Sequence, residues 1–233
     1  MVVGSGMIAS AFAAFRESGS VVIFASGVSN SLETAPDAFE RERKLLETVR
    51  SADPGPLLVY FGTCSADDPE RQDTPYVQHK LAMEAMLAKS EGPWLILRVP
   101  LAIGRNPRST TLAQFLHDRI AHDQGFEVWE GASRYPIDVE DLVRIGRKFI
   151  GDPAMWNRRI NVALRPFPVL EFVRVMEDIV GKKARCTVVR KGQQFDLECP
   201  EVARVAAELN LDLGERYLDR VLRKYFGAAP SPA

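Results

Sequence analysis

The sequence has almost no excess of charge of either sign. Its 233 residues include 30 lysines and arginines and 31 aspartates and glutamates, which gives a formal net charge of -1 at pH 7. A nucleic-acid-binding surface usually gives a protein a clear basic excess, and acidic tails appear as runs of one sign. Neither feature is present, so the charge pattern argues against nucleic acid as a partner.

Long apolar runs and paired cysteines are missing too. No run approaches the roughly 20 residues that a membrane-spanning helix needs, and no basic segment followed by an apolar one marks a signal peptide. Cys64, Cys186 and Cys199 are far apart and form no C-x-x-C motif, which argues against a disulfide framework or a structural zinc site. His117 and His122 share no helix face, so we expect no metal. These absences predict a cytoplasmic protein that does not enter a membrane.

What the sequence does contain is an alternation of short apolar runs with amphipathic segments. Continuous apolar runs are typical of strands in a parallel sheet that is covered on both faces. The alternation therefore predicts an α/β fold, a Rossmann-like doubly wound parallel sheet. The expected strands are 21–25, 57–61, 94–99 and 159–163, and the expected helices are 37–50, 76–89, 111–122 and one that ends at 150.

The last third of the chain has a different sequence pattern, with helices expected at 169–180, 200–210 and 215–226. We expect a Rossmann-like domain over 1–164, of which 105–135 contributes to a substrate lobe. A small C-terminal substrate-binding lobe is expected over 165–227, followed by a frayed tail at 228–233.

A glycine turn stands near the start of the chain. Gly4, Gly6 and Ala9 form a G-x-G-x-x-A pattern between a short strand and a helix expected to run through Phe15. In dinucleotide-binding proteins such glycines permit the turn and let the backbone approach a pyrophosphate. An ordinary glycine-rich turn would explain the same residues.

Tyr76 and Lys80 form a second pattern, near the start of the helix at 76–89. Residues four apart share a helix face, so both side chains are expected to point the same way. An ammonium group near a phenol lowers the phenol's pKa of about 10, which would make Tyr76 a proton donor and acceptor near neutral pH. A surface tyrosine beside a solvated lysine is the simpler explanation of the spacing alone.

Small polar residues follow the apolar runs where strands are expected to end. Thr63 and Ser65 come after 57–61, and Ser26 and Gly27 come after 21–25. Ligands of open α/β sheets bind at the carboxyl ends of the strands, so these residues are candidates for a site. The charged run at 40–44 is expected to be a solvated helix face.

Taken in order, these motifs resemble the extended short-chain dehydrogenase/reductase superfamily, and within it the NAD-dependent epimerases and dehydratases of nucleotide sugars. The resemblance covers nearly the whole chain. It rests on the glycines at 4 and 6, the segments 24–27 and 61–65, the Tyr76 and Lys80 pair, and the segments 98–104 and 134–141.

The resemblance implies a role for each matching residue. Tyr76 would be the general acid/base on a sugar hydroxyl or keto oxygen, and Lys80 would lower its pKa and hold the nicotinamide ribose of NAD or NADP. Thr63, or failing it Ser65, would hydrogen-bond the same oxygen. The expected cofactor-binding residues are Gly4, Gly6, Met7, Ile8, Ser26, Gly27, Lys80 and Pro100, and the expected substrate-binding residues are Ser65, Asn106 and Arg134, the last through a phosphate.

The sequence also departs from the family. Two β-α units are missing between the glycine turn and the strand at 21–25, and no acidic residue lies between Ser18 and Leu32. We therefore expect a shortened sheet that is open on the adenosine side, where NAD and NADP cannot be told apart by the usual acid. Leu101 stands where the family often has an asparagine, and Gly62 stands where it has a serine.

We therefore expect an NAD(P)-dependent oxidoreductase or epimerase that acts on a nucleotide-activated sugar, by 4-keto reduction or epimerisation. A degenerate relative that binds a nucleotide or a partner without turnover is one alternative. An NADP-dependent reductase of a non-sugar substrate is another. The resemblance also implies a homodimer formed through the helices at 37–50 and 76–89.

Overall fold

A five-stranded parallel sheet forms the centre of the computed structural model, which describes residues 1–105 and 111–227. The strand order is β1-β2-β3-β4-β9, and every neighbouring pair is parallel. The strands are β1 (Val2–Val3), β2 (Val21–Phe24), β3 (Leu57–Thr63), β4 (Trp94–Val99) and β9 (Arg158–Asn161). The sequence-based prediction of a Rossmann-like parallel sheet is therefore confirmed.

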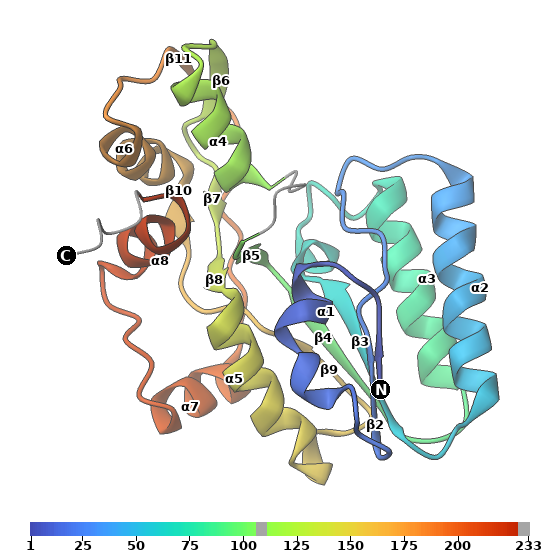
Figure 1. The fold of residues 1–233 in the computed structure, drawn as a ribbon. Helices are drawn as coiled ribbons and strands as arrows, with labels where there is room; N and C mark the ends of the chain where they lie inside the picture. Colours follow the sequence, from blue (N-terminus) through green and yellow to red (C-terminus); the bar gives the residue numbers. More distant parts are fainter. Residues whose placement is uncertain (106–110, 228–233) are drawn as a thin grey trace.

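Helices cover both faces of this sheet, as Figure 1 shows. The side chains of β2 alternate between the two faces: Val22 and Phe24 pack with α2 and α3, and Ile23 packs on the face covered by α1 and α5. This alternation explains why the strands are continuous apolar runs. The helices on the two faces are α2 (Pro36–Ala52) and α3 (Pro75–Lys89), and α1 (Met7–Ala11) and α5 (Val139–Ile150).

The first β-α unit is short. The helix predicted to run through Phe15 ends at Ala11, and a single 3-10 turn, η1 (Ala13–Phe15), follows it. Phe12, which lies between the two, has φ -88° and ψ 18° and its ring is fully buried in the core. The chain then enters β2 beside β1, so the described sheet ends at β1.

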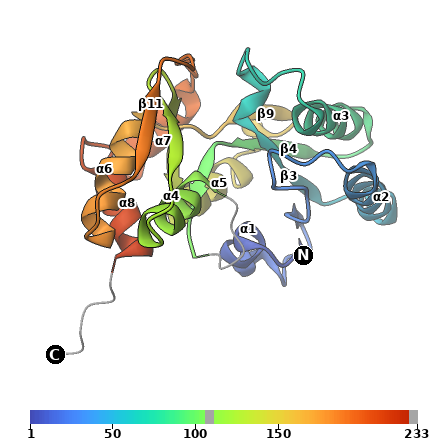
Figure 2. The same cartoon turned by 90° about the horizontal axis from the view of Figure 1, so that it is seen from above.

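A second group of elements lies on the side of the sheet opposite α2 and α3, as Figures 1 and 2 both show. Its helices share a separate hydrophobic core with β6 and β10. Its elements are α4 (Leu112–Ala121), α6 (Val169–Val180), α8 (Tyr217–Phe226), β6 (Phe126–Trp129), β11 (Cys186–Val189), β7 (Ser133–Arg134) and β10 (Phe167–Pro168).

Further elements link this group to the sheet. The parallel pair β5 (Leu101–Ile103) and β8 (Pro136–Asp138) leads from β4 into the group and back to α5. Helix α7 (Pro200–Glu208) packs against α5 and contributes Val202 and Val205 to the core of the main sheet. Of the described residues, no helix is both long and apolar enough to span a membrane.

Candidate functional site

The candidate site lies at the carboxyl ends of β2, β3 and β4. Thr63 is the last residue of β3 and is paired with Val99 at the end of β4. Helix α3 begins close by, because Pro75 occupies its first turn and the Thr74 hydroxyl accepts a hydrogen bond from the Val77 backbone N–H at 3.4 Å. The fold thus places the start of α3 beside the end of β3.

Tyr76 and Thr63 meet at this edge. Their side chains lie close enough for Thr63 to lower the pKa of Tyr76, and both are buried, with 8% and 6% of their surface exposed. The Thr63 hydroxyl also accepts a hydrogen bond from the Ser65 backbone N–H at 3.2 Å. A phenol and a hydroxyl side by side at a strand end can bind one substrate oxygen together and pass a proton to or from it.

Lys80 lies elsewhere. Its Nζ donates hydrogen bonds to Oε1 of Glu42 at 2.9 Å and to the Tyr60 hydroxyl at 3.2 Å, and it lies 5.1 Å from the centre of the Tyr60 ring. Burial lowers the pKa of Lys80, and the charge of Glu42 opposes this effect. The ammonium is therefore drawn across to α2, one turn further along α3 than Tyr76.

The prediction that Lys80 lowers the pKa of Tyr76 is wrong for this structure. Burial raises the Tyr76 pKa to about 12, the Thr63 hydroxyl opposes this rise, and the negative charge of Glu42 adds to it. Spacing places Tyr76 and Lys80 on one face of α3, but the nearest anion decides where an ammonium points.

Glu42 is the anion that fixes this arrangement. It is fully buried, and its Oε1 accepts hydrogen bonds from Tyr60 at 2.6 Å and from Lys80. Its Oε2 accepts one from the Val28 backbone N–H at 2.7 Å and lies 2.9 Å from Nε2 of His79. Burial raises the pKa of Glu42, yet the hydrogen bonds and the charge of Lys80 outweigh it and lower the pKa to about 2.

The prediction that 40–44 is a solvated face is therefore wrong at Glu42. Sequence reasoning also did not identify Tyr60 and His79, which surround the same carboxylate. One signal was available: Phe39, Glu42, Leu46 and Val49 follow helical spacing, so Glu42 lies on the apolar stripe of α2. An acid on an apolar stripe indicates a buried partner of opposite charge.

The glycine turn at Gly4 and Gly6 is the predicted binding site for the pyrophosphate of a dinucleotide. Gly4 has φ +124°, and a Cβ there would lie 2.3 Å from the Ala25 carbonyl oxygen. At Gly6, by contrast, no described atom lies within 4 Å of a Cβ. The turn is therefore tightly built at Gly4 and open at Gly6, which fits a ligand that approaches the backbone there.

The other predicted cofactor-binding residues near this turn differ in what they contact. Met7 lies against Gly104 at the end of β5, whereas Ile8 packs into the core of the sheet. A Cβ on Gly27 would lie 2.6 Å from both Lys80 Nζ and Glu42 Oε1, so the backbone after β2 lies directly over the Glu42–Lys80 pair. Beyond β1 the described sheet has no further strand.

Arg134 is the predicted phosphate ligand on the substrate side. It is half-buried, and its Nη1 donates a hydrogen bond to the carbonyl of Ser133 at 2.7 Å. Among the residues that the structure describes, no carboxylate forms an ion pair with it. Burial and the nearby charge of Arg71 lower its pKa, and the charges of Asp68 and Glu70 raise it again in part. An anion bound there would act in the same direction as these two carboxylates.

The remaining predicted residues are less informative. Pro100 and Ser65 are half-buried at the ends of β4 and β3. Asn106 lies outside the described residues.

The neighbours of Gly62 explain why this chain has a glycine where a serine was expected. A Cβ at Gly62 would lie 2.5 Å from Glu84 Oε1 and 3.2 Å from Arg98 Cγ. Glu84 and Arg98 form a two-pronged ion pair, with Arg98 Nη2 2.8 Å from Glu84 Oε2 and Nε 2.9 Å from Oε1. The glycine makes room for this buried pair beside the site.

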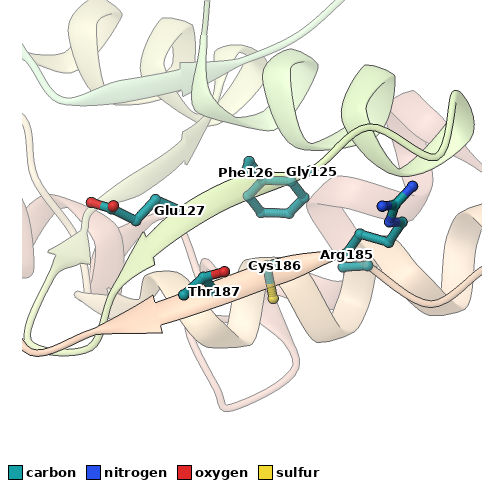
Figure 3. A pocket seen from close by; sticks show the side chains of 7 residues that line it. Gly125, Phe126, Glu127, Arg185, Cys186 and Thr187 are labelled. Carbon is teal, nitrogen blue, oxygen red and sulfur yellow. The ribbon is translucent and has the colours of Figure 1, made fainter.

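A hollow of about 530 Å³ lies far from this site, at the starts of β6 and β11 (Figure 3). None of the predicted site residues lines it. It is lined by Gly125, Phe126, Glu127, Ala184, Arg185, Cys186 and Thr187.

The chain has the fold of the extended short-chain dehydrogenase/reductases. It is similar to the UDP-glucose 4-epimerase of Thermus thermophilus in complex with NAD, with a TM-score of 0.69 and 17% identity over 95% of this chain and 83% of that one. It is also similar to the UDP-glucuronic acid 4-epimerase of Bacillus cereus in complex with UDP-glucuronic acid and NAD, with a TM-score of 0.69 and 15% identity over 89% and 74% of the two chains.

A third similar structure is RMD of Pseudomonas aeruginosa in complex with NADPH, with a TM-score of 0.67 and 17% identity over 90% and 80% of the two chains. No protein-family model and no curated protein sequence matches the chain. At these identities the likeness shows the fold, and function has to be argued from the residues of the site.

Proposed function

We propose that the chain is an NAD(P)-dependent oxidoreductase or epimerase of a nucleotide-activated sugar, with Tyr76 as its general acid/base. The observation that supports this most directly is the closeness of the buried Tyr76 and Thr63 side chains at the carboxyl edge of the sheet. Tyr76 is predicted from its spacing to Lys80 and Thr63 from its place at the end of an expected strand, and they belong to different elements, α3 and β3. Their meeting where ligands of α/β sheets bind favours a catalytic role over a coincidental motif.

The residues of the chain would divide the chemistry as follows. A nicotinamide dinucleotide, when bound, supplies or accepts a hydride. Thr63 orients the substrate oxygen, and Tyr76 exchanges a proton with it. Gly4 and Gly6 with the Ser26–Gly27 loop would lie along the dinucleotide, and Ser65 would contact the substrate.

Arg134 would bind a phosphate of the substrate. Its half-buried guanidinium has no ion-pair partner among the described residues, and guanidinium groups bind phosphates through paired, charge-assisted hydrogen bonds. UDP is the nucleotide part of the substrate in the Bacillus cereus complex. We propose UDP as the first ligand to test at this position.

A second candidate function is binding without turnover. It is favoured by the position of Lys80, which is engaged by Glu42, and by the end of the described sheet at β1. The first candidate predicts that Tyr76→Phe removes most of the activity while dinucleotide affinity stays. The second predicts that the same variant has no functional effect.

The two candidates are separated first by cofactor binding. NAD, NADH, NADP and NADPH are titrated separately into the purified protein, with nicotinamide fluorescence or calorimetric heat as the signal. Saturable micromolar binding of one oxidised and reduced pair supports the enzyme and identifies its cofactor. If all four fail to bind, alone and with UDP-sugars, the enzyme proposal is refuted.

We also propose that α2 and α3 form the interface of a homodimer. A small hollow between them is lined by Leu46, Arg50, Met86 and Leu87 among others. Light scattering after size exclusion gives the mass directly. A monomeric mass across the accessible concentration range contradicts this assignment.

A further inference from the structure

Residues 193–198 form an irregular segment that leads from β11 to α7, as Figure 1 shows. Its side chains differ in exposure: Phe195 and Leu197 are half-buried, and the polar residues around them are exposed. At its start Gly192 has φ +84°, a conformation that favours glycine, and after its end Pro200 is the first residue of α7. The segment therefore spans two fixed points without secondary structure of its own.

The half-buried side chains of this segment cover the carboxyl end of β3. They pack against a small buried cluster formed by Cys64, Tyr135 and Ala163. Cys64 directly follows Thr63, the last residue of β3, and the two have only 3% and 6% of their surface exposed. Thr63 thus has little access to solvent, so a substrate that contacts it needs room that a neighbouring segment must give.

One hydroxyl group holds the segment in place. The Tyr135 hydroxyl donates a hydrogen bond to the Phe195 carbonyl at 2.8 Å and accepts one from the Leu197 backbone N–H at 3.1 Å, and the rings of Tyr135 and Phe195 lie 5.9 Å apart. Among the described residues, 193–198 make no other hydrogen bond and no ion pair. So few anchors are typical of a segment that opens locally, at a free energy below that of global unfolding.

We propose that residues 193–198 are a lid over the carboxyl end of β3, hinged at Gly192 and latched by the Tyr135 hydroxyl, and that a substrate at Thr63 lies beneath it. The second half of this statement rests on the proposed function. The lid opens to admit the nucleotide sugar and closes over it, and its apolar inner side chains then keep water away from the bound substrate. Tyr135 is a positioning residue, since it acts through the lid.

The test uses the cysteines of the chain. Cys64 is buried beneath the lid, and Cys186 lines the open hollow at β6 and β11, where it serves as an internal control. Ligand-free protein is labelled with N-ethylmaleimide, and mass spectrometry of the peptides gives the rate at each cysteine. Tyr135→Phe keeps the ring and removes both hydrogen bonds, so we expect Cys64 to be labelled about tenfold faster or more. Cys186 should keep its rate.

Tyr225→Phe is the matched control. It also removes a tyrosine hydroxyl, one that donates to Asp138 Oδ1 at 2.6 Å, and Tyr225 does not belong to the cluster under the lid. Faster labelling of Cys64 in Tyr135→Phe, with an unchanged rate in Tyr225→Phe, supports the latch. Equal Cys64 rates in the wild type and Tyr135→Phe overturn it, and so does an equal rise in both variants.

The wild type decides the question even where Tyr135→Phe does not fold. Labelling of Cys64 is repeated at urea concentrations below the unfolding transition. A lid that opens locally exposes little surface, so the Cys64 rate should hardly change with urea. A rate that rises as steeply as global unfolding does shows that Cys64 is reached only in the unfolded protein, and this result overturns the lid.

UDP separates the lid from the proposed function. At about ten times its dissociation constant, UDP should slow the labelling of Cys64 in the wild type by up to about tenfold, because it binds beneath the closed lid. If calorimetry shows binding and the Cys64 rate stays unchanged, the substrate does not lie under the lid and that part of the proposal is overturned. If UDP does not bind, the ligand named in the proposed function is contradicted, while the ligand-free labelling still decides the latch.

Discussion

Glu42 and Lys80 form an ion pair of 2.9 Å inside the protein, although they are 38 residues apart and come from different helices. The pair joins α2 to α3 directly beneath the loop that follows β2. A buried charge is tolerated only when it is paired and hydrogen-bonded. Here Tyr60, His79 and the Val28 N–H complete the hydrogen bonds of the carboxylate.

The first prediction compares two glutamates of α2. Glu42→Ala leaves the Lys80 ammonium buried without its counter-charge, so we expect it to lower the free energy of unfolding by about 3–5 kcal/mol. Glu40 lies two residues away, is solvent-exposed and pairs with Arg43 on the surface, so Glu40→Ala should leave the midpoint unchanged. Urea denaturation followed by circular dichroism measures both. Equal effects would show that Glu42 is as solvated as its neighbour.

The second prediction concerns acid. The pKa of Glu42 is about 2 in the folded protein, below its usual value of 4.5. A carboxyl group with a lowered folded pKa stabilises the protein above its unfolded pKa and loses that contribution as pH falls towards the folded value. The difference in the free energy of unfolding between the wild type and Glu42→Gln should therefore be largest at pH 7. It should decrease as the pH falls from about 4.5 towards 2.

Denaturation midpoints at several pH values between 7 and 2.5 measure this gap. Glu40→Gln serves as the control, because solvent screens the surface pairs of Glu40, and its gap should stay small throughout. A Glu42→Gln gap that does not change with pH would contradict the low pKa.

The strands and helices were predictable from the sequence because their patterns are local. The run at 57–61 is apolar at every position and can only be buried on both faces, and 169–180 was predicted with the same bounds as α6. The meeting of Thr63 with Tyr76 was also accessible, since parallel strands end at one edge and Pro75 sets the start of the following helix.

The direction of Lys80 and the burial of Glu42 could not be predicted in this way. Spacing along α3 places Lys80 on a face but does not show which anion lies opposite it. That depends on how α2 is placed against α3, which is a matter of tertiary packing. Glu42 lies in a run of charged residues, so its position on the apolar stripe was not evident from the sequence. In the structure Glu42 differs from Glu40 in its burial.

The third prediction uses the open space at Gly6. Gly6 has φ -76°, and no described atom lies within 4 Å of a Cβ there, so Gly6→Val should fold with an unchanged thermal midpoint. If a dinucleotide approaches this backbone, the added methyl groups occupy its place and should raise the dissociation constant by about tenfold or more. Gly19→Val is the control, since Gly19 is equally open and lies outside the predicted site. Wild-type affinity in Gly6→Val would remove the glycine turn from the cofactor site.

The last prediction separates binding from stability at Arg134. Its guanidinium is half-buried and donates to the Ser133 carbonyl without an ion-pair partner among the described residues. Asp68 and Glu70 act on it only from beyond ion-pair distance, and a buried charge without a direct counter-charge is costly, so Arg134→Met should leave the thermal midpoint unchanged or raise it. The same change removes a charge-assisted contact to phosphate, so the affinity for UDP should fall by about tenfold or more.

Arg204→Met, on α7 and exposed beside Glu208, should bind UDP as the wild type does. Calorimetric titration of UDP into the three proteins measures this, and a lower midpoint with unchanged UDP affinity in Arg134→Met would assign Arg134 a structural role instead.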